Sequence, residues 1–190
     1  MPVSILTGKK YPEAKPQFER SIEIKRQASG DNIMDVAYDY YFLGLINFYD
    51  RQNEKAETYL KKSLYIQEKI LGADNQDLIN ILRTLATFYS MQSDITSECN
   101  TLEKLIAIRE KSPGNNQGVL ADDLSRLAVL YYKQRNYMKA APLFSRTLYM
   151  KEQKLGTENP ELCHYYKNLA FCYQGLGKFD DAESLLNRSL

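Results

Sequence analysis

The best candidate for covalent chemistry in this sequence is the pair Cys163 and His164, because a thiol beside an imidazole is the nucleophile of many hydrolases. His164 is also the one histidine of the chain. Both residues fall within a predicted helix, where consecutive side chains point about 100° apart and do not face each other. We therefore expect His164 to lie on a helix surface or in a groove, and we expect no catalytic dyad.

Other residues that could serve an enzyme have simpler explanations. The pairs Asp122-Asp123 and Asp180-Asp181 adjoin predicted helix starts, where the helix dipole favours negative charge. Residues 8–10 read Gly-Lys-Lys but lack the upstream glycine of a phosphate-binding loop. Histidine and carboxylate residues do not recur at metal-ligand spacing. The sequence therefore predicts no enzyme, no metal site and no cofactor.

The composition excludes several classes of protein. The chain has 190 residues, of which 44% are hydrophobic and 26% charged, so it can bury a core. Its net charge of +1 lacks the basic excess that nucleic-acid binding requires. No apolar run approaches the roughly 18 residues of a membrane span. Cys99, Cys163 and Cys172 form no C-x-x-C motif, which indicates thiols of a reducing compartment, so we expect a cytoplasmic protein.

The elements that position these residues follow from an internal repeat of 42 residues. Apolar, glycine and small residues recur at this spacing without insertion or deletion. A fixed period of this length is typical of a helical repeat array. The recurring columns are Ile22, Leu64, Ile106, Leu148 and Leu190; Ile24, Ile66, Ile108 and Met150; Gly30, Gly72, Gly114 and Gly156; Leu43, Leu85, Leu127 and Leu169; and Gly44, Ala86, Ala128 and Ala170.

Each repeat contains two amphipathic helices. In the first, Leu124, Leu127 and Tyr131 follow spacings of three, four and seven, which place them on one helical face. In the second, Ala140 and Phe144 begin a stripe at every fourth residue. The small residue of the first helix lies where two helices approach closely, because a large side chain would overpack the contact.

The boundaries of the helices have chemical signals as well. Gly72 and Gly156 follow charged helical stretches and suit the left-handed residue past a helix end, and Asn75 and Asn159 supply caps for the next helix. We expect a leader at 1–10 and a repeat array at 11–190. The expected helices are 12–28, 33–50, 53–71, 75–92, 95–111, 117–135, 137–155, 159–175 and 179–190.

The repeat resembles the tetratricopeptide repeat (TPR), in the 42-residue variant of kinesin light chains. The small residue at the eighth place of the unit, Tyr at the eleventh and Ala at the twentieth carry the resemblance, together with the endings 71–75 and 155–159 of the form L-G-x-[DE]-N. The resemblance implies an all-α fold, a right-handed α-α superhelix of about nine helices and four to four-and-a-half repeats. It also implies an adaptor or scaffold that binds a protein or peptide in its concave groove.

The same resemblance identifies the positions that would line the groove. They are aromatic toward the N-terminal end and cationic to polar toward the C-terminal end, which suits a partner with acidic and aromatic residues. The family's asparagine ladder is kept only at Asn168, since Phe42, Thr84 and Arg126 occupy its other places. The expected groove residues are Tyr38, Tyr41, Leu45, Phe48, Asn80, Arg83, Thr87, Asp122, Ser125, Arg126, Val129, Tyr132, His164, Lys167, Asn168 and Phe171.

Two features of the repeat leave alternatives open. The array starts and stops inside a repeat and ends on the apolar residues Leu186 and Leu190, which predicts a fragment of a larger protein. The alternative function is a structural or regulatory arm that stacks on neighbouring repeats or self-associates through these ends. The second helices carry an alanine column of Ala56, Ala140 and Ala182, which Glu98 interrupts. Pro113 shortens the same helix, and together these departures indicate a local shift, a loosened joint or a hinge.

Overall fold

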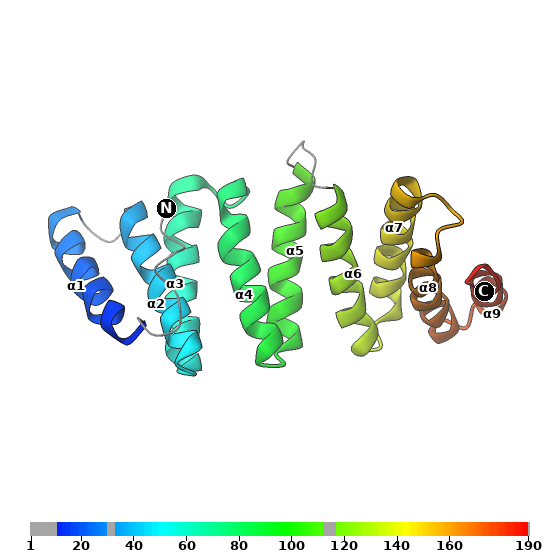
Figure 1. Ribbon diagram of the computed structural model, residues 1–190, viewed down its shortest axis with the longest axis horizontal. Coiled ribbons are helices and arrows are strands. Elements are labelled where there is room, and N and C mark those ends of the chain that lie inside the picture. Colours follow the sequence, from blue (N-terminus) through cyan, green and yellow to red (C-terminus); the bar gives the residue numbers. More distant parts are fainter. Residues whose placement is uncertain (1–10, 30–32, 112–116, 190) are drawn as a thin grey trace. The chain divides into compact units, whose positions relative to one another are not determined.

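The computed structural model describes residues 11–29, 33–111 and 117–189. Over these residues the chain forms nine α-helices and two short 3-10 helices, and no strand (Figure 1). This confirms the predicted all-α class with about nine helices. Several features named from the sequence lie outside the described residues, namely the leader at 1–10, Gly30, Pro113, Gly114 and Leu190.

The helices divide into two compact units, Met1–Asp94 and Ile95–Leu190, called here the first and the second unit. Consecutive helices pack against each other within each unit. The first unit contains α1 (Tyr11–Ser29), α2 (Met34–Tyr49), α3 (Asn53–Leu71), η2 (Gln76–Leu78) and α4 (Ile79–Met91). The second unit contains α5 (Ile95–Lys111), α6 (Gln117–Lys133), α7 (Tyr137–Leu155), η3 (Pro160–Leu162), α8 (Cys163–Gly175) and α9 (Phe179–Arg188).

Asparagine caps begin the segments that lead into α4 and α8. The side-chain oxygen of Asn75 accepts the backbone N–H of Asp77 at 2.8 Å, and Asn159 accepts the N–H of Glu161 at the same distance. A 3-10 turn follows each cap before the α-helix starts. The caps satisfy backbone donors that a helix start would otherwise leave without a partner.

The glycines at the ends of α3 and α7 adopt a conformation that other residues avoid. Gly72 has φ 88° and ψ 152°, and Gly156 has φ 83° and ψ 152°. The positive φ agrees with the expectation, while ψ lies outside the left-handed helical region and in a range open essentially to glycine alone. The chain therefore leaves both helices by the same sharp, glycine-dependent turn.

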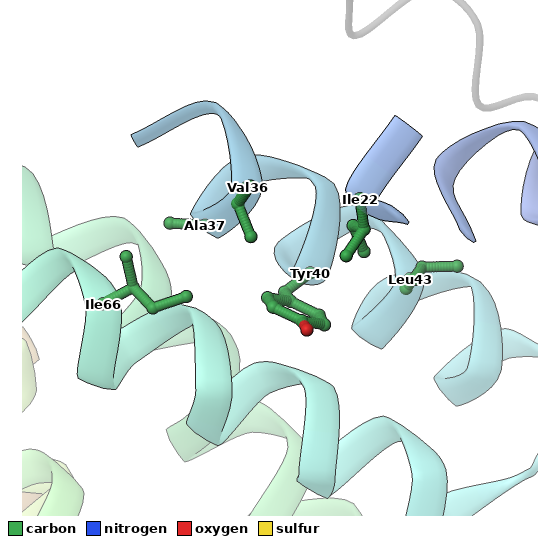
Figure 2. Packing of buried hydrophobic residues seen from close by; sticks show 6 residues of the cluster. All are labelled: Ile22, Val36, Ala37, Tyr40, Leu43 and Ile66. Carbon is green, nitrogen blue, oxygen red and sulfur yellow. The ribbon is translucent and has the colours of Figure 1, made fainter. Parts of the chain in front are cut away.

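The core of the first unit is built from the repeating apolar columns. Figure 2 shows Ile22 of α1, Tyr40 and Leu43 of α2, and Ile66 of α3 converging on one cluster. All four side chains are buried. Burying a residue of this size stabilises a fold by about 1.5–3 kcal/mol, so the columns supply the main stabilising contacts between these helices.

The small residues of the first helices lie at the closest approaches. Ala86, Ala128 and Ala170 are fully buried. At Gly44, the fourth member of the column, an added Cβ would lie 2.7 Å from Cγ of Leu60 in α3. The column therefore marks positions where a first helix has no room for a larger side chain, and Gly44 lies too close to Leu60 even for a methyl group.

Tyrosine recurs at 42-residue intervals as Tyr89, Tyr131 and Tyr173. Tyr173 is half-buried, and the other two combine burial with a hydrogen bond to the preceding helix. The Tyr89 hydroxyl donates to Oε1 of Glu57 in α3 at 3.2 Å, and the Tyr131 hydroxyl donates to Oε1 of Glu103 in α5. Burial and the neighbouring glutamate both raise the pKa of Tyr131, which keeps the phenol protonated. The sequence predicted the buried ring, while the glutamate partners at different repeat positions gave no periodic signal.

Candidate partner-binding faces

In the first unit, the predicted groove residues lie on α2 and α4. Tyr38 is 47% exposed, and Asn80, Arg83 and Thr87 are exposed as well. Tyr41, Leu45 and Phe48 are half-buried; they share one face of α2 with Tyr38 because they follow at spacings of three and four. The face of α2 is thus aromatic and that of α4 polar.

The aromatic residues of this face are partly held by other side chains of the unit. The Tyr41 hydroxyl lies 3.1 Å from Oγ1 of Thr84 and connects α2 to α4. The Phe48 ring meets the buried Phe88 ring edge-on at a centroid distance of 5.4 Å. Tyr38 therefore offers the most accessible ring of the predicted α2 set.

Phe42, at the place of the family's asparagine, packs within the fold instead. Its ring stacks on Phe18 of α1 at a centroid distance of 5.3 Å. Thr84, at the same place in α4, donates its hydroxyl to the backbone oxygen of Asn80 at 3.0 Å. The first unit consequently has no side-chain amide at the asparagine-ladder places of α2 and α4.

Arg83 is the cation of this face. One of its terminal nitrogens donates to Oδ1 of Asn80 at 3.0 Å, which orients the guanidinium along α4. The residue remains exposed. Arg83 can therefore meet an external carboxylate without leaving its present contact.

In the second unit, the predicted residues lie on α6 and α8. Tyr132, His164, Lys167 and Phe171 are exposed, and Phe171 is 43% exposed. Ser125, Val129 and Asn168 are half-buried. The second unit therefore carries exposed rings on both helices and an exposed cation, Lys167, on α8.

His164 and Cys163 do not form an isolated reactive pair. The His164 ring packs against the Tyr165 ring at a centroid distance of 3.8 Å. Nζ of Lys151 lies 5.7 Å from the centre of the same Tyr165 ring. Cys163 is half-buried and His164 exposed, as expected for neighbours on one helix.

Asp122 is neutralised within the second unit. Its Oδ1 accepts from Nζ of Lys151 in α7 at 2.6 Å. This pair borders an open cleft of about 830 Å³ between the start of α6 and the end of α7, which Val119, Tyr149 and Lys154 also line. Within the described ranges, no group of three His, Cys, Asp or Glu residues could hold a metal ion.

Arg126 already has a carboxylate partner in its own chain. Its Nε and one terminal nitrogen each lie 2.7 Å from Oε1 of Glu98 in α5. Glu98 is only 3% exposed. Glu98 departs from the alanine column, and Arg126 departs from the asparagine ladder. These two unusual residues pair with each other, which neither column reveals when it is read separately. The ion pair ties α5 to α6 at the position suspected of loosening.

A second ion pair joins the same two helices. Nε of Arg109 lies 2.7 Å from Oδ2 of Asp123, although its N–H does not point at that oxygen, so the contact is ionic without a directed hydrogen bond. Burial raises the pKa of Asp123, against the lowering effects of Arg109 and Arg126. The α5–α6 contact thus contains two ion pairs, each between a buried and a half-buried side chain, and each helix supplies one acid and one cation.

The Arg109–Asp123 pair has a counterpart exactly two repeats earlier. Nζ of Lys25 in α1 lies 2.7 Å from Oδ2 of Asp39 in α2, and both residues precede Arg109 and Asp123 by 84 positions. The other two places of this column, 42 residues after each aspartate, hold Ile81 and Tyr165. We call Lys25–Asp39 and Arg109–Asp123 the ionic junctions. They alternate with junctions that have no carboxylate at this place of the repeat. The alternation is visible in the sequence only at a period of 84 residues.

Comparison with known proteins identifies the class to which the chain belongs. The tetratricopeptide repeat profile matches residues 35–111 and 121–190. The chain therefore belongs to the tetratricopeptide repeat family, as the sequence pattern predicted. No curated protein sequence matches it.

Solved structures show the same fold at low sequence identity. The nearly identical TPR-like repeats described as those of a Podosopora anserina kinesin light chain match with a TM-score of 0.68 and 20% identity, over 95% of this chain and 85% of that one. BtubC (BKLC) from P. vanneervenii matches with a TM-score of 0.64 and 19% identity, over 95% and 72%. MamA matches with a TM-score of 0.55 and 19% identity, over 96% and 85%. The resemblance to kinesin-light-chain-like repeats is thereby confirmed.

Proposed function

We propose that this chain is an adaptor or scaffold whose first helices bind a segment of a partner protein. The observation that carries the proposal is that, within each unit, these helices expose aromatic and charged side chains. Tyr38 and Arg83 lie in the first unit, and Lys167 and Phe171 in the second. Aromatic rings and cations are the groups that dominate protein interfaces, and repeats of this family generally bind proteins.

The charges favour a partner segment with acidic groups beside aromatic or apolar ones. Arg83 and Lys167 are exposed and occupy the same place in their repeats, 84 positions apart. Each unit therefore offers one such cation, on α4 and on α8. Because Glu98 engages Arg126, we assign external carboxylates to Arg83 and Lys167 rather than to Arg126.

A peptide-display selection on the purified chain tests this function. The selection runs beside the variant Arg83→Glu/Lys167→Glu and beside a control with the same charge change, Arg20→Glu/Lys104→Glu, at exposed positions of α1 and α5. An acidic motif enriched on the wild type and on the control, and lost on the first variant, supports the proposal. Equal enrichment on all three proteins, or on none, contradicts it.

A second candidate function is stacking on another helix through α1 or α9. Ile24 is 55% exposed, whereas its column mates Ile66 and Ile108 are 5% and 2% exposed. Leu186 is half-buried, whereas Phe144 at the same repeat position is fully buried. Sedimentation over a wide concentration range tests self-association. Oligomers that disappear in Ile24→Ser/Leu186→Ser support it, and a monomer at every concentration contradicts it.

We also propose that the chain acts without catalysis and in the cytoplasm. The family fold is typically a non-enzymatic scaffold, which supports the first point. Cys99, Cys163 and Cys172 are unpaired thiols, which supports a reducing compartment. None of the helices that the structure describes is long and apolar enough to cross a membrane. Labelling of the endogenous protein in fractionated cells tests the location.

A further inference from the structure

Helix α3 carries a line of three exposed lysines away from the faces described above. Lys55, Lys62 and Lys69 follow each other at intervals of seven residues, and all are exposed. Seven residues make almost two helical turns, so the three side chains share one face and are spaced by about 10 Å. We call these residues the lysine stripe, which extends over about 21 Å of the helix.

The lysines of the stripe differ from their neighbour in having no acid to neutralise them. Lys61 forms an ion pair with Glu57 at 2.6 Å. Within the part of the chain that the structure describes, Lys55, Lys62 and Lys69 have no carboxylate within ion-pair distance. Three positive charges therefore stand on one helix face of a protein whose net charge is only +1.

Two of these ammonium groups lie over tyrosine rings instead. Nζ of Lys62 is 5.4 Å from the centre of the Tyr40 ring, the ring at the centre of the cluster in Figure 2. Nζ of Lys69 is 4.7 Å from the centre of the Tyr65 ring. A ring attracts the cation and restrains the side chain without removing its charge. The stripe is thus partly ordered while it remains positive.

Tyr65 adds an aromatic surface to the stripe. It lies between Lys62 and Lys69 along the helix and is 55% exposed. An exposed tyrosine presents a large apolar area at a small cost in conformational entropy, which is why tyrosine is frequent at binding hot spots. The face therefore combines charge for orientation with a ring for contact.

The second unit shows how the same face looks when its own chain neutralises it. At the equivalent places of α7, Arg146 pairs with Glu110 of α5, and Nζ of Lys139 lies 3.9 Å from Oε1 of Glu103. In α1, the place of Glu110 is taken by Arg26, 84 positions earlier. Of the two acids that serve α7, Glu110 is therefore replaced by a cation in the first unit, whereas Glu103 is matched there by Glu19.

We propose that the lysine stripe and Tyr65 bind an acidic α-helix of a partner protein. A helix lying along α3 with carboxylates at seven-residue intervals would place one acid opposite each lysine, since both helices have the same rise. A leucine or similar residue between the acids would contact Tyr65. Charge complementarity of this kind orients the partner and speeds association. This surface is separate from the faces of α2, α4, α6 and α8, and a partner could engage both.

The test uses a fluorescent alanine-rich helical peptide of about 20 residues, with three glutamates at seven-residue intervals. A control peptide has the same composition but carries its glutamates at five-residue intervals, which distributes them around the helix. Binding to the full chain is followed by fluorescence anisotropy at low salt. We expect the first peptide to bind at least about fivefold more tightly, because only its charges can meet all three lysines together.

Substitutions then assign the binding to the stripe. Lys55→Glu/Lys62→Glu/Lys69→Glu should weaken binding of the first peptide at least about tenfold, since each exposed pair contributes up to a few-fold. The control Lys104→Glu/Lys133→Glu/Lys154→Glu carries the same charge change at exposed positions and should bind almost as well as the wild type. Tyr65→Ala should weaken binding with no change of charge. Circular dichroism verifies that all variants remain folded.

Several outcomes would overturn the proposal. Equal affinity for the two peptides, or equal losses of affinity in the stripe and control variants, would show that the stripe is a solvated surface that does not bind a partner helix. Stripe-dependent binding to phosphatidylserine vesicles or to single-stranded RNA, with no peptide binding, would replace the acidic helix by another anionic partner. The variant Arg83→Glu/Lys167→Glu should keep the stripe binding, so failure here and failure of the proposed function can be told apart.

Discussion

Replacing Gly44 with alanine is the substitution for which repeat pattern and structure give opposite expectations. The other members of its column are Ala86, Ala128 and Ala170, and alanine is about 1 kcal/mol more favourable than glycine inside a helix. By these criteria Gly44→Ala should stabilise the protein. The contact with Leu60 reverses this expectation.

The magnitude follows from the distances to Leu60. The new Cβ would lie 2.7 Å from both Cγ and Cδ2 of Leu60 and 3.2 Å from its backbone nitrogen. Carbon atoms pack at about 3.5–4.0 Å, and the fully buried Leu60 has little freedom to move. Overpacking of this kind costs about 1–3 kcal/mol, and contact with Cγ and the backbone places it in the upper part of that range. The net loss is then about 1–2 kcal/mol, or roughly 2–8 °C in melting temperature.

The assay is urea and thermal unfolding followed by circular dichroism, with Gly118→Ala as control. An added Cβ at Gly118 would meet only Nζ of Lys154, at 3.6 Å, so this variant should be as stable as the wild type or slightly more stable. In a Leu60→Ala background the contacts with Cγ and Cδ2 are absent and only the backbone nitrogen remains, at 3.2 Å, so Gly44→Ala should cost clearly less there than in the wild type. If Gly44→Ala raises the melting temperature of the wild type, the close approach does not govern this position and the reasoning is wrong.

Three further predictions concern the ion pair, the core and a thiol. Glu98→Ala and Arg126→Asn should each lower the unfolding free energy by about 1–3 kcal/mol in urea denaturation. The double variant should lose at least about 1 kcal/mol less than the sum of the two single losses. Additive losses would contradict the pairing. Phe144→Ala, at a fully buried position, should cost about 3–5 kcal/mol in the same assay, and a loss below about 1 kcal/mol would contradict its burial. Burial raises the pKa of Cys172 to about 11, so at pH 9 only ~1% is thiolate and Cys163 should alkylate first by mass spectrometry. Equal alkylation rates for the two thiols would disprove the burial of Cys172. Because the pKa of Cys172 is raised in the folded protein, its contribution to stability is full below pH 9 and is lost as the pH rises toward 11.

Much of the fold could be predicted because its core depends on columns that repeat every 42 residues. Ile22, Leu43 and Ile66 recur in type, and their partners within the unit recur with them. A periodic core is legible in one sequence, because each repeat serves as a comparison for the others. Helix class and family follow from that comparison alone.

The candidate faces were harder to predict because side-chain partners do not share the period. Tyr41 meets Thr84, and Arg126 meets Glu98, across helices whose relation the columns do not specify. Glu98 looked like a defect of one column and Arg126 like an available cation. Only the contact between them shows that each explains the other. Exposure of Tyr38, Arg83 and Lys167 likewise depends on neighbours that are distant in the sequence.

The ionic junctions determine how this array can change length. If 42 residues between α1 and α4 were deleted, α4 would follow α1 in place of α2. Lys25 would then face Ile81 where it now meets Asp39, and the cation would have no carboxylate. Deleting 84 residues would bring Lys25 to Asp123, and the ionic contact would be restored. Insertions obey the same rule. Two hairpins together, rather than one, are therefore the smallest segment that can be gained, lost or exchanged with every junction still matched.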